Sequence, residues 1–144
     1  MTDPFVDTDV LIRLLTGDDL KKQGEAAALF QAVEAGSLRL AAPATVIADA
    51  VYVLSSPRLY NKSRADVAAM LIPLVRLPGF RIGNRRALLR ALDLYATSNL
   101  DFGDALIVAS MEQRGARLLY SYDTHFDRIP TLARRSPGAA SSEQ

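Results

Sequence analysis

Hydrophobic residues in this chain recur mostly every three or four positions, which is the spacing of amphipathic helices. A first helix is expected to begin near Val10. A second opens at Pro43, which suits a first helical position, and continues to about Leu54. Four further stretches have the same periodicity, and Pro73 is expected to kink or shorten one of them. These predicted helices cover residues 20–35, 64–77, 85–97 and 102–114.

Short apolar runs between the helices predict strands. They cover residues 5–6, 38–42, 80–82 and 117–122, and the last is the clearest. Because strands alternate with helices, we expect an α/β fold in which parallel strands are covered by helices. No internal repeat or linker divides the chain. We therefore expect one domain over residues 1–135, followed by a flexible polar tail over residues 136–144.

Composition excludes several classes of protein. The 144 residues are 49% hydrophobic and 23% charged, which is typical of a globular domain. The absence of cysteine excludes disulfides, thiolate zinc sites and cysteine nucleophiles. No apolar run reaches the roughly 20 residues of a membrane helix, and no signal peptide is evident, so a cytoplasmic location is expected. The net charge of +1 argues against binding nucleic acid by bulk charge alone.

Aspartate is unusually frequent, because it accounts for 12 of the 16 acidic residues. Each one has an ordinary structural interpretation. Asp7 follows a predicted strand and can cap the next helix, whose first turn holds Asp9. Asp101 and Asp104 are spaced as in a capping arrangement, and Asp123 suits an Asx-turn.

Asp49 has no such ordinary interpretation, because it lies in the middle of a predicted helix that is otherwise apolar. A helix of that pattern is largely buried. An unpaired buried carboxylate costs several kcal/mol, so it must be protonated, paired or bound to a cation. No lysine or arginine lies within four residues of Asp49, although a distant arginine remains an alternative partner.

The other aspartates are expected to meet at one edge of the sheet, because the carboxyl ends of parallel strands share that edge. Asp49 is within reach of it. Converging carboxylates raise one another's pKa unless a divalent cation is present. Oxygen ligands without cysteine, and with a single histidine, favour magnesium or manganese over zinc. Such a cation activates water and neutralises charge on a phosphoryl group, so phosphodiester hydrolysis is the natural hypothesis.

Four short motifs then occur in a specific order. They are FVDTDVLIR at residues 5–13, the acidic helix at 45–54, DFGDALI at 101–107 and SYDTHFDRIP at 121–130. With these motifs the chain resembles PIN-domain ribonucleases over about residues 5–137, and among them the VapC toxins of bacterial toxin–antitoxin pairs. The resemblance implies a three-layer α/β/α domain with a central parallel sheet of four or five strands. It also implies metal-dependent endonucleolytic cleavage of RNA, with Mg²⁺ as cofactor and Mn²⁺ as a substitute.

The resemblance also assigns roles to individual residues. The four catalytic and metal-binding acids are Asp7, Asp49, Asp104 and Asp123, with Asp49 acting directly or through a water molecule. Asp101 is an accessory acid, and the supporting residues are Thr8, Asp9 and Ser121. Three positions depart from the family pattern, because Asp49 replaces the usual glutamate, Asp9 the usual asparagine and Ser121 the usual threonine. The shorter Asp49 side chain is expected to weaken metal binding.

The resemblance further implies a VapB-like antitoxin that blocks the acidic cleft and a homodimer formed through helices. The helices at residues 20–35 and 64–77 are candidates for these surfaces, although core packing explains their pattern equally well. Basic residues at the rim are candidates for contacts with RNA phosphates. They are Arg13, Arg58, Lys62, Arg64 and Arg128.

Two other functions are compatible with parts of the sequence. A non-catalytic PIN-like domain that binds RNA or a protein partner is the main alternative, and Asp49 is the feature that favours it. Asp7, Thr8 and Asp9 also faintly resemble the nucleophile motif of haloacid-dehalogenase-type phosphatases. Those enzymes need a later lysine, and no lysine follows Lys62.

Overall fold

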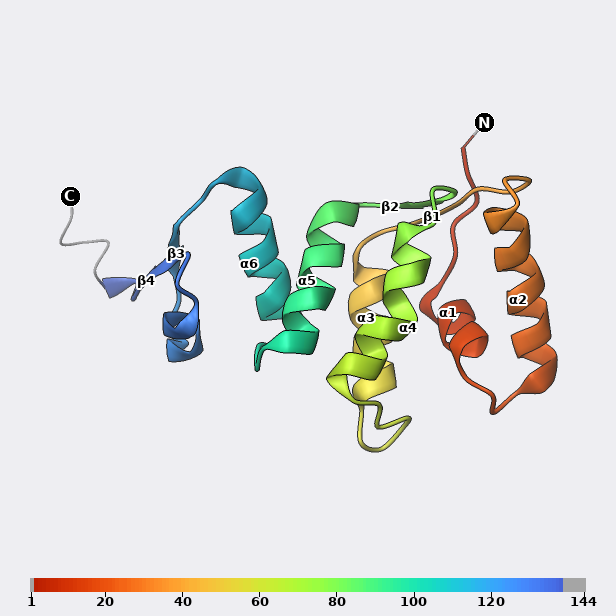
Figure 1. Cartoon of the computed structure of the whole chain (residues 1–144), viewed down its shortest axis with the longest axis horizontal. Helices are drawn as coiled ribbons and strands as arrows, with labels where there is room; N and C mark the ends of the chain where they lie inside the picture. Colours follow the sequence, from red (N-terminus) through yellow and green to blue (C-terminus); the bar gives the residue numbers. More distant parts are fainter. Residues whose placement is uncertain (1, 139–144) are drawn as a thin grey trace.

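We describe residues 2–138 from a computed structural model of the chain (Figure 1). The first half contains α1 (Thr8–Leu15), α2 (Leu20–Glu34), β1 (Leu40–Ala42), α3 (Thr45–Ser55), α4 (Arg64–Arg76) and β2 (Phe80–Ile82). The second half contains α5 (Arg85–Thr97), α6 (Phe102–Arg114), β3 (Leu118–Tyr120), the 3₁₀ helix η1 (Thr124–Arg128) and β4 (Ala133–Arg135).

The predicted helices are confirmed, and α5 and α6 have the predicted bounds. Helix α4 runs through Pro73 and ends at Arg76, one residue before its predicted end. The elements η1 and β4 were not predicted. Residues 139–144 of the predicted tail lie outside the described residues. Across residues 2–138, no helix combines the length and the apolar character that a membrane span requires.

The core forms where β1 and β2 meet the surrounding helices. Phe30 from α2 packs edge-on against Phe80 from β2, with ring centroids 5.7 Å apart. Helix α4 contacts β2, and α3 and α5 contribute buried residues to the same core as the two strands. The largest fully buried side chains are Phe80, Leu11, Ile47, Leu54, Leu71, Leu88, Leu92, Val67, Val75 and Val108.

The strands pair in parallel, which confirms the α/β class. Leu40 pairs with Phe80 and Ala42 with Ile82, and Phe5 adds an isolated parallel bridge to Ala41. Strand β3 pairs with β4 in the same sense. The expectation of one sheet of four or five strands is not met, however. The described residues form two separate sheets of two strands each.

The second sheet is kept apart by the way α5 and α6 pack. The Arg64 Nη1 atom donates to the carbonyl oxygens of Tyr95, Ser98 and Leu100, and the guanidinium lies 4.5 Å from the Tyr95 ring centroid. The Tyr95 ring in turn contacts Phe102 edge-on at the start of α6. These contacts hold α6 beside α5. Residues 115–117 then span only about 10 Å before β3 begins.

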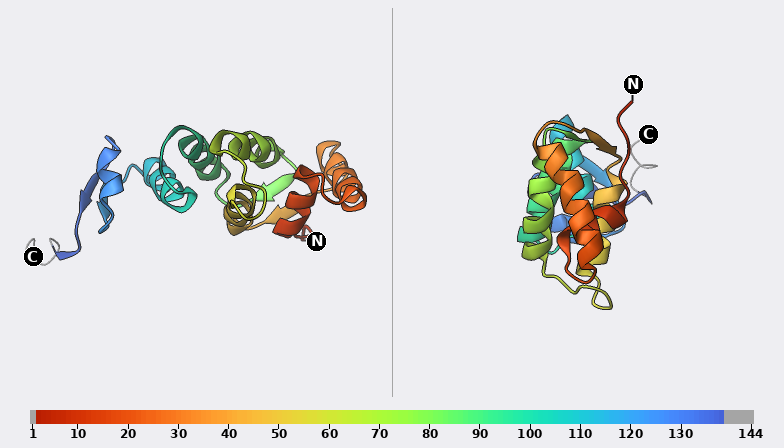
Figure 2. Two further views of the ribbon diagram at one scale, coloured as in Figure 1. Left: turned by 90° about the horizontal axis from the view of Figure 1, so that it is seen from below. Right: turned by 90° about the vertical axis from the view of Figure 1, so that its right-hand side faces the viewer.

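The β3–η1–β4 segment consequently lies at one end of the molecule, and α2 lies at the other (Figures 1 and 2). Leu118 and Tyr120 of β3 are 42% and 43% exposed. We call residues 118–135 the C-terminal unit. Its exposed apolar residues distinguish it from β1 and β2, which are part of the core.

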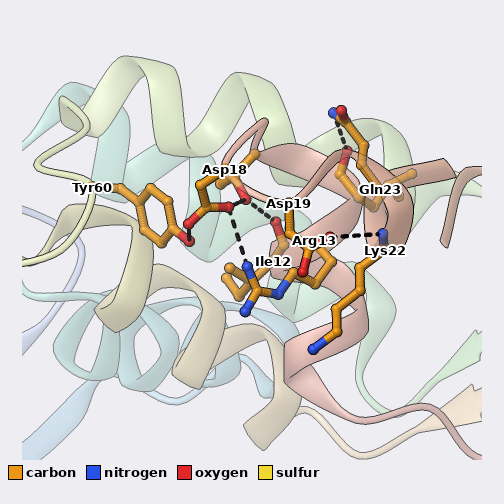
Figure 3. Close-up of polar contacts among 9 residues, drawn as sticks. Ile12, Arg13, Asp18, Asp19, Lys22, Gln23 and Tyr60 are labelled. Atoms are coloured by element: carbon orange, nitrogen blue, oxygen red, sulfur yellow. Dashed lines mark hydrogen bonds and ion pairs between the residues drawn. The ribbon is translucent and has the colours of Figure 1, made fainter. Parts of the chain in front are cut away.

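The Asp18 carboxylate, between α1 and α2, joins these two helices to the segment that follows α3 (Figure 3). The Tyr60 hydroxyl donates to Asp18 Oδ2 at 2.7 Å, and Thr16 Oγ1 donates to Asp18 Oδ1 at 3.0 Å. Arg13 Nη1 also lies 3.3 Å from Asp18 Oδ1. The Tyr60 and Thr16 hydrogen bonds lower the pKa of Asp18. The network therefore fixes residues 56–62, which carry Lys62 at their end.

Replacement of Gly79 tests the close approach of β2 to the rest of the core. A Cβ atom on Gly79 would lie 3.1 Å from both Val33 Cγ1 and Val33 O, and 3.3 Å from Leu38 O. We expect Gly79→Ala to lower the free energy of unfolding by about 1–3 kcal/mol in urea denaturation, because backbone atoms must move. Gly83→Ala is the matched control, since a Cβ there meets nothing within 4 Å. Equal losses in both variants would contradict this packing.

Candidate acidic site

Three carboxylates lie together where α6 begins and β3 ends. Asp101 occupies the N-cap position of α6, but its side chain makes no capping hydrogen bond among the described residues. Asp104 is half-buried in the first turn of α6, and Asp123 precedes η1. We call Asp101, Asp104 and Asp123 the α6 acidic group.

Burial and neighbouring charges both act on Asp104 within the α6 acidic group. Burial raises the pKa of the Asp104 carboxyl, and the neighbouring carboxylates of Asp101 and Asp123 raise it further. His125 lowers the pKa of Asp104. A nearby positive charge would therefore favour the ionised form of Asp104.

The Asp123 side chain is fixed by the turn that follows β3. Its Oδ1 accepts a hydrogen bond from the His125 backbone amide at 2.9 Å and lies 2.8 Å from His125 Nδ1. Ser121 Oγ accepts from the Asp123 amide at 3.0 Å. These contacts confirm the predicted Asx-turn. Ser121 therefore positions the Asp123 backbone.

Two further predicted acids lie on the N-terminal helices. Asp7 caps α1, as predicted, by accepting a hydrogen bond from the Thr8 amide at 2.7 Å. Thr8 Oγ1 donates to the Val46 carbonyl at 3.4 Å and so connects the start of α1 to α3, which carries Asp49. We call Asp7 and Asp49 the α1–α3 acidic pair. Asp9 is exposed in the first turn of α1.

The prediction that Asp49 is buried is wrong. Helix α3 turns five apolar side chains toward the core, namely Val46, Ile47, Ala50, Val51 and Leu54. Asp49 lies between these positions, on the exposed side of the helix together with Thr45 and Tyr52. Its apolar neighbours therefore do not enclose it, and solvation removes the need for a partner. Within residues 2–138 its side chain has no hydrogen bond or ion pair.

The structure brings together only part of the predicted set. Asp101 and Asp123 act on Asp104, but Asp7 and Asp49 are not among the groups that shift its pKa. The C-terminal unit lies at the far end of the molecule from α1 (Figure 1). In the part of the chain that is described, no three His, Asp or Glu side chains are arranged to hold a metal ion. The expected convergence of all four acids is therefore not met in this arrangement.

The candidate basic residues have different surroundings. Arg64 is occupied by three backbone carbonyls, so it has a structural role that its sequence pattern did not indicate. Arg13 pairs with Asp18. Lys62 and Arg58 are exposed, and their side chains have no polar partner among residues 2–138. Sequence reasoning also missed Tyr52, although its spacing of three from Asp49 places both on one helix face.

A sequence model of the PIN domain matches residues 5–132. Among solved structures, the Mycobacterium tuberculosis toxin VapC20, described as cleaving the sarcin–ricin loop, is 21% identical to this chain. That match covers 90% of this chain and 97% of the toxin chain, with a TM-score of 0.38. A search of curated protein sequences found no match.

Proposed function

This chain belongs to the PIN-domain family, and from that premise we propose that it is a metal-dependent endoribonuclease. We further propose that it is the toxin of a VapBC-type toxin–antitoxin pair. The observation that carries the nuclease proposal is the α6 acidic group, in which burial and the carboxylates of Asp101 and Asp123 raise the pKa of Asp104. Natural proteins tolerate such repulsion where a positive charge is to be bound.

The donor chemistry of the acidic residues suits magnesium. All five proposed ligands are carboxylates, and hard divalent cations prefer oxygen donors. The side chain of Asp101 is not used as a helix cap. A bound cation would neutralise these carboxylates and offset the charge that develops on a phosphate during hydrolysis. We propose that the ligands are Asp7, Asp49, Asp104 and Asp123, with Asp101 as an accessory.

The proposal requires the α1–α3 acidic pair and the α6 acidic group to approach each other. The backbone edges at Phe5 and at β3 could bring them together by pairing. Val6 donates to the Ala41 carbonyl and Ala41 donates to the Pro4 carbonyl, so the Phe5 backbone faces the other way. Phe5 is 72% exposed, and its amide and carbonyl have no hydrogen-bond partner in residues 2–138. We propose that β3 pairs with this edge in the active form.

Such pairing would complete the acidic site for a geometric reason. Asp7 follows Phe5 and Val6 directly, and Asp123 follows β3 by three residues. Parallel strands end at the same edge of a sheet, so both carboxylates would come to that edge. Pairing would also cover Leu118 and Tyr120, whose apolar surface faces solvent in this arrangement.

Two kinds of protein partner belong to the same proposal. A VapB-like antitoxin would inhibit the toxin by covering the acidic residues, and a second copy of the chain would form a homodimer. Leu20 of α2 is 76% exposed and is available for such contacts, as the sequence suggested. Helix α4, the other candidate, instead packs its apolar residues against its neighbours, and Val67, Leu71 and Val75 are fully buried.

The alternative function is a PIN-like domain that binds RNA or a partner without cleaving it. The observation that favours it is that no three His, Asp or Glu side chains within residues 2–138 are arranged to hold a metal ion. It differs from the nuclease proposal in its chemical outcome, because a non-catalytic domain would bind RNA and leave the phosphodiester bonds intact.

RNA cleavage by carboxylate variants tests the nuclease proposal. We expect the wild-type chain to cut structured RNA in Mg²⁺, and Asp104→Asn and Asp7→Asn each to reduce the rate roughly hundredfold or more. Asparagine keeps the size of the side chain and removes its charge. Asp66→Asn, in the exposed first turn of α4, is the control and should retain full activity. RNA binding without cleavage by the wild type would instead support the alternative.

Engineered cysteines test whether β3 pairs with the Phe5 edge, because the natural chain has no cysteine that could interfere. Phe5→Cys is combined in turn with Leu118→Cys, Leu119→Cys and Tyr120→Cys, and disulfide formation is followed by non-reducing electrophoresis. Disulfides require Cα atoms within about 7 Å, so one pair in register should form rapidly. A monomeric product indicates pairing within a chain and a dimeric product indicates pairing between two chains.

The control for this experiment combines Leu118→Cys with Leu20→Cys, at an exposed position on α2. That pair should stay reduced under the same conditions. If all three pairs with Phe5 also stay reduced, the proposed joining of the two sets of acids is wrong.

A further inference from the structure

Tyr52 is a large aromatic side chain that the fold leaves in solvent. It is 73% exposed, and within residues 2–138 its ring has no aromatic or cation–π contact and its hydroxyl has no hydrogen bond. It shares the exposed face of α3 with Thr45 and Asp49, because the three lie four and three residues apart. The ring is therefore available to a ligand next to a proposed catalytic acid.

Tyr52 lies on the wall of a groove of about 680 Å³. This volume is within the roughly 300–1,000 Å³ range of small-ligand sites. One wall is α3, with Ala48, Val51, Tyr52 and Ser55, and the opposite wall is the start of α6, with Asp101, Phe102 and Gly103. Residues 62–64 and Tyr95 complete the lining. The groove thus connects the face that carries Asp49 with the α6 acidic group.

Two positive charges line the same groove. The Arg64 guanidinium is held in place by carbonyl oxygens, the shortest contact being 2.6 Å to Leu100 O. Lys62 has an exposed ammonium group with no polar partner in the described chain. Its backbone amide donates to the Leu54 carbonyl at 2.8 Å, which fixes its main chain beside the end of α3. Lys62 is therefore a free cation on a fixed main chain.

We propose that this groove binds one unpaired nucleotide of a single-stranded RNA segment. The base stacks on the Tyr52 ring, and a flanking phosphate pairs with Lys62. This inference rests on the proposed function, because it makes the groove the substrate subsite next to the α6 acidic group. A nucleotide bound there directs the adjoining phosphate toward Asp101, which lies on the wall opposite Tyr52 and belongs to the α6 acidic group.

Single-stranded RNA fits these residues better than a duplex. A base can stack on a side chain only when its face is free, and bases in a double helix are already stacked and paired. An exposed aromatic beside a basic side chain is the combination that single-strand-binding proteins use. Stacking on one aromatic side chain is worth about 1–3 kcal/mol, which corresponds to roughly 5- to 150-fold in affinity.

RNA binding by Tyr52 variants tests the inference. All proteins carry Asp104→Asn, so that RNA is bound in Mg²⁺ but not cut. Fluorescence anisotropy measures the affinity for a labelled single-stranded decaribonucleotide and for its duplex. We expect Tyr52→Ala to weaken single-strand binding at least fivefold and Tyr52→Phe to leave it nearly unchanged. Lys62→Ala should weaken binding and remove one phosphate contact. The slope of the logarithm of the binding constant against the logarithm of the salt concentration should then become shallower by about 0.7.

Gln31→Ala is the control, because Gln31 is exposed on α2, the helix at the far end of the molecule, and should have no effect. A decamer containing 2-aminopurine reports stacking directly. Its fluorescence should fall on binding to the protein that keeps Tyr52 and to the Tyr52→Phe variant, but not on binding to the Tyr52→Ala variant. Unchanged affinity in Tyr52→Ala, or equally tight binding of the duplex, would overturn the inference. RNA cleavage by the wild-type chain, which lacks Asp104→Asn, is assayed in parallel and tests the nuclease proposal separately.

Discussion

Burial of a carboxylate beside two others at the start of α6 is the constraint on which the functional proposal depends. Asp104 is half-buried between Asp101 and Asp123, and each neighbour makes its ionised form less favourable. The fold keeps all three carboxylates in place nonetheless. Asp123 is fixed by hydrogen bonds within its turn, and Asp101 stands at the N-cap position without serving as a cap. Such an arrangement costs stability unless a cation compensates it.

The packing of α6 against α5 determines where the α6 acidic group lies. Arg64 binds three carbonyl oxygens at the α5–α6 connection, so α6 is fixed beside α5 and the C-terminal unit projects from it. The same packing forms the groove between α3 and α6. It also leaves the bridge between Phe5 and Ala41 apart from the sheet of β3 and β4 among the described residues. Assembly of the complete acidic site therefore also requires strand pairing, which this packing of α5 and α6 does not provide.

Much of the local structure could be predicted, because it depends on neighbouring residues. Apolar periodicity gave the bounds of α5 and α6, and the position of Asp123 after a strand predicted its Asx-turn. The exposure of Asp49 could not be inferred, since an apolar helix can still leave a narrow face to solvent when only one side meets the core. The division into two sheets and the role of Arg64 depend on contacts between residues distant in sequence, which no local pattern records.

The central claim is that carboxylates from both halves of the chain bind one divalent cation. A crystal structure grown with Mn²⁺, with anomalous diffraction recorded near the manganese absorption edge, tests it most directly. The account predicts an anomalous peak bounded by Asp104 and Asp123 on one side and by Asp7 on the other. A structure in which Asp7 stays remote and no manganese is bound near Asp104 would contradict it.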